Sequence, residues 1–209
     1  MRDTRLLIVF VKAPRPGRVK TRLAQSVGSK AACLIYQILV SRVLAQVGSL
    51  RSVELRFHPA AARNEIRQWC RRGWSIAPQG GGDLGERLKR AFREAFSARF
   101  DRVALIGSDC PELTARDIEQ AWNALDGNDV VLGPSRDGGY WLVALHNSIP
   151  KLFAKIPWST DRVLAATLAH AKSARLRVHL LRELADVDTE DDWKAYLRRN
   201  AFAQIALGE

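Results

Sequence analysis

The sequence has few cysteines, and the three that it has form no recognisable pattern. Cys33, Cys70 and Cys110 lie far apart in a chain of 209 residues, and no two of them make a CxxC pair. An odd number of separated cysteines gives neither a disulfide framework nor a zinc or redox motif. We therefore expect reduced thiols, as in a cytoplasmic protein.

Long apolar runs are also missing. The apolar run near the start covers only residues 6–11, and no small-residue cleavage site follows it. A secretory signal needs a longer apolar segment, and a membrane helix needs about 18–20 apolar residues. The sequence thus predicts a soluble cytoplasmic protein with no membrane span.

Acidic residues are fewer than basic ones. The chain has 33 Lys and Arg against 22 Asp and Glu, a formal net charge of +11. Seven of the basic residues lie within residues 1–22, where Asp3 is the only acid. An excess of this kind is typical of proteins that bind polyanions or phosphorylated ligands. Because no recognised nucleic-acid-binding motif is present, we favour a local phosphate site over a nucleic acid partner.

Strand and helix patterns alternate along the chain. Hydrophobic residues make up 47% of the sequence, enough for a core and too many for an intrinsically disordered chain. The patterns predict strands at 6–11, 53–57, 75–77, 102–106, 130–132, 141–145 and 178–181, and helices at 30–47, 60–72, 86–100, 115–125, about 160–172 and after Thr189. Such alternation predicts one α/β domain over residues 1–209, with a mostly parallel, doubly wound sheet of Rossmann-like type. Ligands of these folds bind beyond the carboxyl ends of the strands.

A basic loop follows the first predicted strand. Residues 12–22 contain Lys12, Arg15, Arg18, Lys20 and Arg22. Loop amides, a helix start and cations together suit phosphate. The loop is not a Walker A motif, since a valine precedes the Lys-Thr pair where that motif has glycine. The alternative is a solvated basic turn.

A glycine-rich loop covers residues 80–85 and formally matches GxGxxG. It follows a weak strand pattern and lies outside the first strand–helix unit, where a dinucleotide fingerprint belongs. Asp109 does lie about twenty residues further on, so a dinucleotide site of a dehydrogenase stays an alternative. We favour a loop that contacts a nucleotide or its sugar, and a plain helix-start loop is the third reading.

Carboxylates follow two predicted strands. Asp109 comes directly after the strand at 102–106, and Asp186 and Asp188 alternate near the last strand. Alternate residues of an extended segment face the same way, so these carboxylates suit one Mg²⁺ or Mn²⁺ site. The structural alternatives are an Asx turn at Asp109 and, for Asp188, a position that simply precedes the helix capped by Thr189.

Two further segments are candidates for binding a second substrate. Residues 137–140 place an acid, two glycines and a tyrosine between two strands, and the glycines allow close backbone approach. An Asp-Gly hairpin turn is the alternative. Residues 158–160, Trp-Ser-Thr, lie at a predicted helix start, where contact with an acceptor and a staple-and-cap role are both open.

Read together, six blocks resemble a known family. The blocks are KAPRPGRVKTRL, GGGDLGERL, GSDCP, GPSRDGGYWL, IPWST and DVDTEDDW, and they run from Lys12 to about Trp193. In this order they resemble bacterial glycosyltransferases with the GT-A fold, the fold of nucleotide-diphospho-sugar transferases. That family is often linked with radical-SAM enzymes, and some members are assigned to arsenosugar biosynthesis. It is similar to 2-phospholactate guanylyltransferase, whose phosphate-binding Lys-Ser-Arg-Leu resembles residues 20–23 here, and to molybdopterin nucleotidyltransferases.

The motifs and the resemblance together define the candidate site. Asp109, Lys20 and Asp137 are the candidate catalytic residues. The candidate metal ligands, for Mg²⁺ or Mn²⁺, are Asp109 with Asp188 or Asp186. The candidate nucleotide and phosphate ligands are Lys12, Gly17, Arg18, Lys20, Thr21, Arg22, Asp83 and Gly85. The candidate sugar or acceptor ligands are Asp137, Gly138, Gly139, Tyr140, Trp158, Ser159 and Thr160.

The resemblance implies a metal-dependent transferase with a nucleotide-activated donor. The first expectation is transfer of a sugar from a nucleotide sugar to a small acceptor. The alternative is nucleotidyl transfer from an NTP to a phosphorylated acceptor, which stays open because GSDCP has one acid where many glycosyltransferases have Asp-x-Asp. A nucleoside diphosphate as product indicates the first reaction, and pyrophosphate indicates the second.

Overall fold

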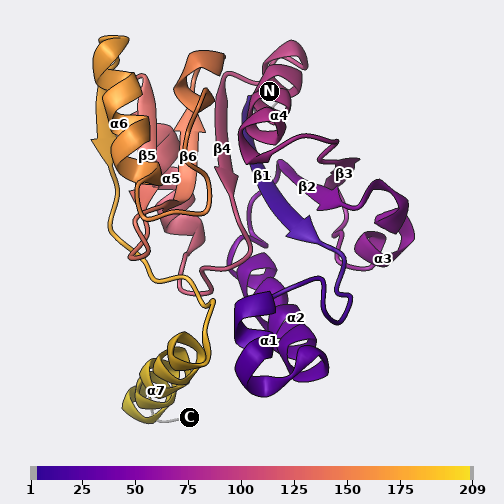
Figure 1. The fold of residues 1–209 in the computed structure, drawn as a ribbon. Helices are drawn as coiled ribbons and strands as arrows, with labels where there is room; N and C mark the ends of the chain where they lie inside the picture. Colours follow the sequence, from indigo (N-terminus) through magenta and orange to yellow (C-terminus); the bar gives the residue numbers. More distant parts are fainter. Residues whose placement is uncertain (1–3, 208–209) are drawn as a thin grey trace.

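A seven-stranded sheet forms the centre of the molecule (Figure 1), and its strand order is β3-β2-β1-β4-β6-β5-β7. The computed structural model describes residues 4–207. The strands are β1 (Arg5–Lys12), β2 (Val53–His58), β3 (Ser75–Pro78), β4 (Arg102–Ile106), β5 (Val130–Pro134), β6 (Tyr140–Leu145) and β7 (Val178–Leu180). Strands β1 to β4 pair in parallel, β6 is antiparallel to both of its neighbours, and β7 is parallel to β5. The predicted α/β fold with a mostly parallel sheet is confirmed.

Helices cover both faces of this sheet. They are α1 (Thr21–Val27), α2 (Ser29–Gln46), α3 (Arg63–Arg67), α4 (Leu84–Ser97), α5 (Ala115–Ala124), α6 (Val163–Ser173) and α7 (Glu190–Leu207), with 3₁₀ turns η1 (Ala60–Ala62) and η2 (Pro150–Phe153). One core cluster joins the sheet to α2, α3 and α5, and the other joins it to α4, α6 and η2. Alternate residues of β1 enter the two clusters, Leu7 and Val9 on one side and Leu6 and Ile8 on the other. Burial of both faces explains the unbroken apolar run of β1.

Three helices differ from the prediction. Helix α1 was not predicted, because it starts after Lys20 with no side-chain cap and so has no cap signal in the sequence. The helix expected over 60–72 ends at Arg67, because the chain tightens into a turn in which the Trp69 amide bonds the Ile66 carbonyl at 2.9 Å. The cap expected at residues 159–160 was wrong: α6 begins at Val163, and the Thr160 hydroxyl donates to the Pro157 carbonyl at 2.7 Å instead.

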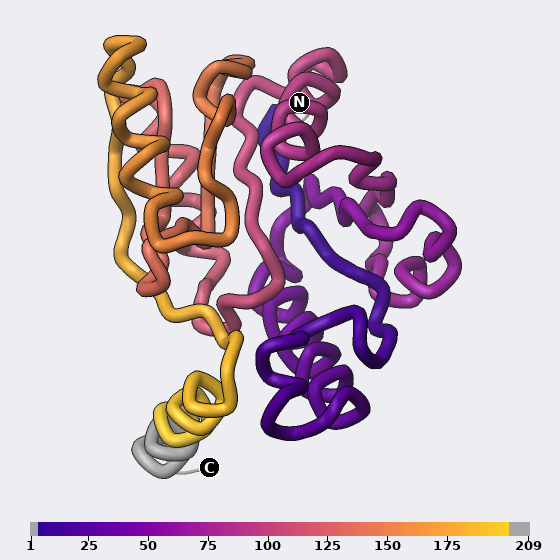
Figure 2. The backbone as a smooth tube through the Cα atoms, viewed as in Figure 1, coloured from indigo at the N-terminus to yellow at the C-terminus, as the bar shows by residue number. Residues whose placement is uncertain are grey.

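The C-terminal segment returns to the edge of the sheet at which the parallel strands end. Figure 2 shows the chain from β7 passing beside the start of α1 before it enters α7. Lys20 and Asp188 meet there although 168 residues separate them. A small cluster of Leu39, Val187 and Tyr196 packs α7 against α2. None of the described helices is both long enough and apolar enough to cross a membrane.

Candidate active site

A cavity of about 700 Å³ opens at the carboxyl ends of the parallel strands. Its walls come from the loop after β1, the end of β3 with the start of α4, the loop after β4, the β5–β6 hairpin, the segment before α6 and the segment after β7. All of these meet at one sheet edge, because β6 runs antiparallel and therefore starts where its neighbours end. This is the position at which sheets of this type bind ligands.

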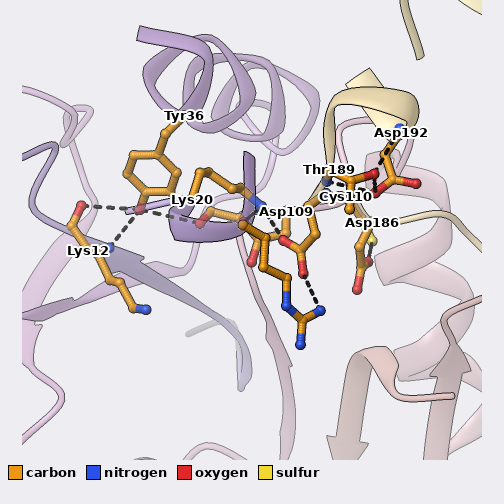
Figure 3. A network of polar contacts seen from close by, with 11 residues as sticks. Lys12, Lys20, Tyr36, Asp109, Cys110, Asp186, Thr189 and Asp192 are labelled. Atoms are coloured by element: carbon orange, nitrogen blue, oxygen red, sulfur yellow. Dashed lines mark hydrogen bonds and ion pairs between the residues drawn. The ribbon is translucent and has the colours of Figure 1, made fainter. Parts of the chain in front are cut away.

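Tyr36 of α2 ties the end of β1 to the loop after β4. Its hydroxyl accepts a hydrogen bond from the Lys12 amide at 2.7 Å and donates to the Lys12 carbonyl at 3.1 Å. Ser108 donates to the same hydroxyl at 3.4 Å. Burial raises the pKa of Tyr36 to about 12, so the hydroxyl stays neutral as this network requires. The backbone of Lys12, which lines the cavity, is thereby tied to Tyr36 (Figure 3).

Lys20 lies between two of the predicted metal ligands. Its Nζ is 2.5 Å from Asp109 Oδ1 and 2.9 Å from Asp188 Oδ1, and only 4% of its side chain is exposed. Burial by itself lowers the pKa of Lys20, but the attraction of the two carboxylates outweighs burial and holds the pKa above its ordinary value. The lysine is therefore a charged counter-ion of both carboxylates.

Asp186 is held differently from Asp188, although both line the cavity. The buried Val187 lies between them, and its amide donates to the Asp109 carbonyl at 3.0 Å. The Cys110 thiol donates to Asp186, and Asp186 has no basic partner in the described part of the chain. Burial raises the pKa of Asp186 to about 7, and the neighbouring carboxylates add to this rise while the thiol opposes it. Asp188 therefore shares a positive charge with Asp109, whereas Asp186 faces a thiol.

The β5–β6 hairpin presents Asp137. Its Oδ1 accepts hydrogen bonds from the Ser135 hydroxyl and from the Gly139 amide at 2.9 Å. Gly138 has φ +84°, and a Cβ there would lie 2.1 Å from the Asp161 carbonyl oxygen. The hairpin therefore needs glycine at this position, because the backbone of Asp161, which follows Trp158, Ser159 and Thr160 in the chain, packs directly against it.

The glycine-rich loop is shaped by two arginines of α4. Arg90 donates to the carbonyls of Gln79 and Gly81, and Arg87 donates to the Gly82 carbonyl at 3.0 Å. Arg87 also reaches the Gln79 amide oxygen at 3.2 Å, and both Arg87 and Gln79 line the cavity. Neither Arg87 nor Gln79 was among the predicted site residues, although Arg87 belongs to the GGGDLGERL block and lies one helical turn after Asp83.

The structure brings most of the predicted site residues to the cavity, but not all. Those that line it are Lys12, Lys20, Thr21, Arg22, Asp109, Asp137, Gly139, Tyr140, Trp158, Ser159, Thr160, Asp186 and Asp188. Those that do not line it are Gly17, Arg18, Asp83, Gly85 and Gly138. Asp83 caps α4 by accepting from the Glu86 amide at 2.8 Å. Gly85 is buried, and a Cβ there would lie 2.8 Å from the Phe153 carbonyl oxygen.

The fit of a metal ion can be judged from the donor set. Within residues 4–207 no group of three or more His, Cys, Asp or Glu side chains is arranged to hold a metal. Two carboxylates, from Asp109 and Asp188, do converge on one positive charge. Mg²⁺ is commonly bound by one or two carboxylates, with substrate phosphates and water as its other ligands. The residues therefore fit an ion that binds together with a phosphorylated substrate.

Comparison with known proteins gives a family and a set of similar folds. A family model described as an uncharacterized protein conserved in bacteria, DUF2064, matches residues 43–160. A crystal structure from Desulfovibrio desulfuricans, described as a candidate nucleotide-diphospho-sugar transferase, is 35% identical, with a TM-score of 0.89 over 95% of this chain and 88% of that one. No curated protein matches the chain.

More distant structures share the fold alone. CMP:2-keto-3-deoxy-manno-octonic acid synthetase complexed with CTP is 10% identical, with a TM-score of 0.60 over 96% of this chain and 98% of that one. Rv0371c from Mycobacterium tuberculosis, in a complex with manganese, is 17% identical, with a TM-score of 0.51 over 93% of this chain and 98% of that one.

Proposed function

The chain belongs to the DUF2064 family, and from that premise we propose that it is a metal-dependent transferase that moves a sugar from a nucleotide sugar to a small acceptor. The observation that carries this proposal is the meeting of opposite charges in the cavity. Lys12, Arg22 and Arg87 line the cavity together with Asp109 and Asp188, and Lys20 lies between these two carboxylates. Cations for a diphosphate beside carboxylates for a divalent ion are the parts that such a donor needs.

The cations of the cavity stabilise the leaving group in the proposed reaction. In this proposal Asp109 and Asp188 hold a Mg²⁺ or Mn²⁺ ion, which supplies positive charge to the donor diphosphate when bound. Lys12, Arg22 and Arg87 neutralise the charge that develops on the nucleoside diphosphate as its bond to the sugar breaks. A protein with the same fold has a structure in complex with manganese, which supports the use of a divalent ion.

In the proposed reaction, Asp137 accepts the proton of the attacking hydroxyl. Two donors fix its Oδ1 from the same hairpin, and its Oδ2 has no hydrogen-bond partner among the residues that the structure describes. A general base needs a fixed orientation and a free oxygen at the substrate side. Trp158, on the neighbouring segment, adds an apolar ring to the same wall.

The charge of the acceptor wall favours glycosyl transfer. Asp137, Asp161 and Asp186 line this wall, and none of them pairs with a lysine or arginine in the described part of the chain. A phosphorylated acceptor would meet like charges there, whereas a hydroxyl acceptor would not. Nucleotidyl transfer is the second candidate, because residues 20–23 resemble the phosphate-binding block of a guanylyltransferase and the CTP-bound synthetase shares the fold.

A thermal-shift screen of nucleoside diphosphates, NTPs and nucleotide sugars, each with and without Mn²⁺, tests the proposal. We expect a nucleotide sugar to raise the melting temperature only when Mn²⁺ is present. Asp109→Asn should abolish this shift and keep the fold, whereas the matched change Asp101→Asn, which lies outside the cavity, should leave the shift unchanged.

Product analysis then separates the two reactions. Release of a nucleoside diphosphate from the stabilising nucleotide sugar supports glycosyl transfer. Release of pyrophosphate from an NTP would instead show nucleotidyl transfer. If a nucleotide raises the melting temperature equally with and without Mn²⁺, the metal has no part in the reaction. The association with radical-SAM enzymes and arsenosugar biosynthesis, which the resemblance implies, stays a prediction.

A further inference from the structure

Lys20 has an unusual place in the cavity. Its ammonium is enclosed, with 4% of the side chain exposed, while the carboxylates that hold it are 44% exposed at Asp109 and 38% exposed at Asp188. The backbone at Lys20 adopts a left-handed conformation, with φ 47° and ψ 50°, immediately before α1. Figure 3 shows the side chain reaching toward the loop after β4 from the loop after β1.

We propose that in the metal-free protein Lys20 occupies the cation position shared by Asp109 and Asp188, and that a divalent ion enters this position only when the Lys20 ammonium moves out to the phosphates of a bound nucleotide. This inference rests on the proposed function, because it concerns the metal and the nucleotide of the same site. It assigns to Lys20 a role in ordering the binding of the two, in addition to phosphate contact.

The two cations cannot share the same pair of oxygens. Lys20 Nζ lies 2.5 Å and 2.9 Å from the two Oδ1 atoms. A Mg²⁺ ion takes carboxylate oxygens at about 2.0–2.1 Å. An ion bound to both oxygens would therefore stand where the ammonium stands, with strong repulsion between the two positive charges.

The displaced ammonium needs a new anion. A buried charge that loses its partner is strongly unfavourable, so Lys20 does not leave its carboxylates for an apolar wall. The lysine stem is long and flexible, and it borders the cavity beside Thr21 and Arg22. The diphosphate group of a nucleotide bound in the cavity provides the negative charge that makes the movement of the Lys20 ammonium favourable. Metal and nucleotide binding are then positively coupled through Lys20.

Arg22 is a second cation near Asp188 and serves as the comparison for Lys20. Its NH1 is 3.8 Å from Asp188 Oδ2, and 62% of its side chain is exposed. It is a cation near the same carboxylate, but it does not occupy the position between the two acids. Removal of Arg22 changes the local charge as much as removal of Lys20 does, without emptying the shared position.

The test measures Mn²⁺ affinity without nucleotide, by the electron paramagnetic resonance of free Mn²⁺ in titrations of the full chain. We expect Lys20→Met to bind Mn²⁺ at least about fivefold more tightly than the wild type, at the lower end of the usual range of coupling between sites. Lys20→Arg, which keeps a cation, should bind as weakly as the wild type, and Arg22→Met should change the affinity much less than Lys20→Met. Equal or weaker binding by Lys20→Met, or an equal gain in Arg22→Met, would overturn the proposal.

A second measurement uses the unmodified chain and does not depend on the folding of any variant. The Lys20 ammonium resonance is followed by NMR of ¹⁵N-lysine-labelled protein, first with Mg²⁺ alone and then with Mg²⁺ and pyrophosphate. We expect the resonance to shift only when both are present; a full shift with Mg²⁺ alone, or none with both, contradicts the ordering. The proposed function fails separately, if no nucleotide sugar stabilises the protein or releases a nucleoside diphosphate.

Discussion

The basic side chains that line the cavity, which we call the basic wall, and the carboxylates that line it, the acidic wall, come from the chain in different ways. On the basic wall, Lys12, Lys20 and Arg22 lie within eleven residues of one loop, and only Arg87 comes from elsewhere. The acidic wall draws each carboxylate from a separate segment, namely the loop after β4, the β5–β6 hairpin, the segment before α6 and the segment after β7. A contiguous cluster of charges can be seen in a sequence. The acidic wall forms only when the strand order of the sheet brings its separate segments together.

Arg22 of the basic wall and the carboxylates of the acidic wall differ in how firmly they are held. Arg22 is 62% exposed and makes one long ion pair, so its charged end is free to follow a ligand. Asp137 is held by two donors, and Asp109 and Asp188 by one buried lysine. We therefore expect the acidic wall to position the reacting groups and the basic wall to supply affinity. Three substitutions test this division.

Asp137→Asn should have the largest effect. The amide keeps the shape of the side chain but cannot accept the acceptor proton as a base. The rate of transfer should fall by roughly 10²- to 10⁴-fold, while the dissociation constant of the donor changes little. Initial rates give the first quantity and calorimetry the second, with Asp101→Asn as a control. If the variant loses affinity for the donor and keeps its turnover, Asp137 contributes to donor binding and is not the general base.

Arg87→Met should have an intermediate effect, on affinity. Loss of a charged hydrogen bond to phosphate is worth about 1.5–3 kcal/mol, or roughly 10- to 100-fold in the dissociation constant. The loss should appear for nucleoside diphosphates and not for nucleosides, which lack phosphate. Arg93→Met, an exposed arginine on the same helix and outside the cavity, is the matched control. An equal loss for nucleosides would mean that Arg87 acts only through the shape of the glycine-rich loop.

Asp186→Asn should have the smallest effect, which is a change in how the free energy of unfolding depends on pH. Burial first, and then the carboxylates around it, raise the pKa of Asp186 to about 7 in the folded protein. The folded state therefore binds more protons than the unfolded state between about pH 4 and pH 7, so the free energy of unfolding falls as pH rises through this window.

The slope from one such group is less than about 1.4 kcal/mol per pH unit. Denaturant unfolding of the metal-free protein at several pH values should show the slope in the wild type and a flatter curve in Asp186→Asn. The exposed Asp161→Asn should keep the wild-type slope. If Asp186→Asn keeps it too, the slope does not come from a raised pKa of Asp186.

Local chemistry made much of the fold predictable. The unbroken apolar run of β1 and the Thr114 capping box at α5 are local signals, and both lie where the sequence indicated. Helix α1 was missed because its start depends on a left-handed residue with no cap, which no local signal announces. Asp83 and Gly85 were assigned to the nucleotide from their motif, but the structure uses them for a helix cap and for close packing.

The sequence by itself determined the alternating elements, the basic loop, and the placement of candidate carboxylates after strands. These depend on periodicity, turn chemistry and composition, which act over a few residues. Tertiary structure alone decided that Lys20 meets Asp109 and Asp188, that Asp186 turns to Cys110, and that Arg87 joins the cavity. Each of these contacts joins segments that the sheet brings together across long stretches of chain, and its energy depends on burial and on neighbouring charge, neither of which is defined before the fold exists.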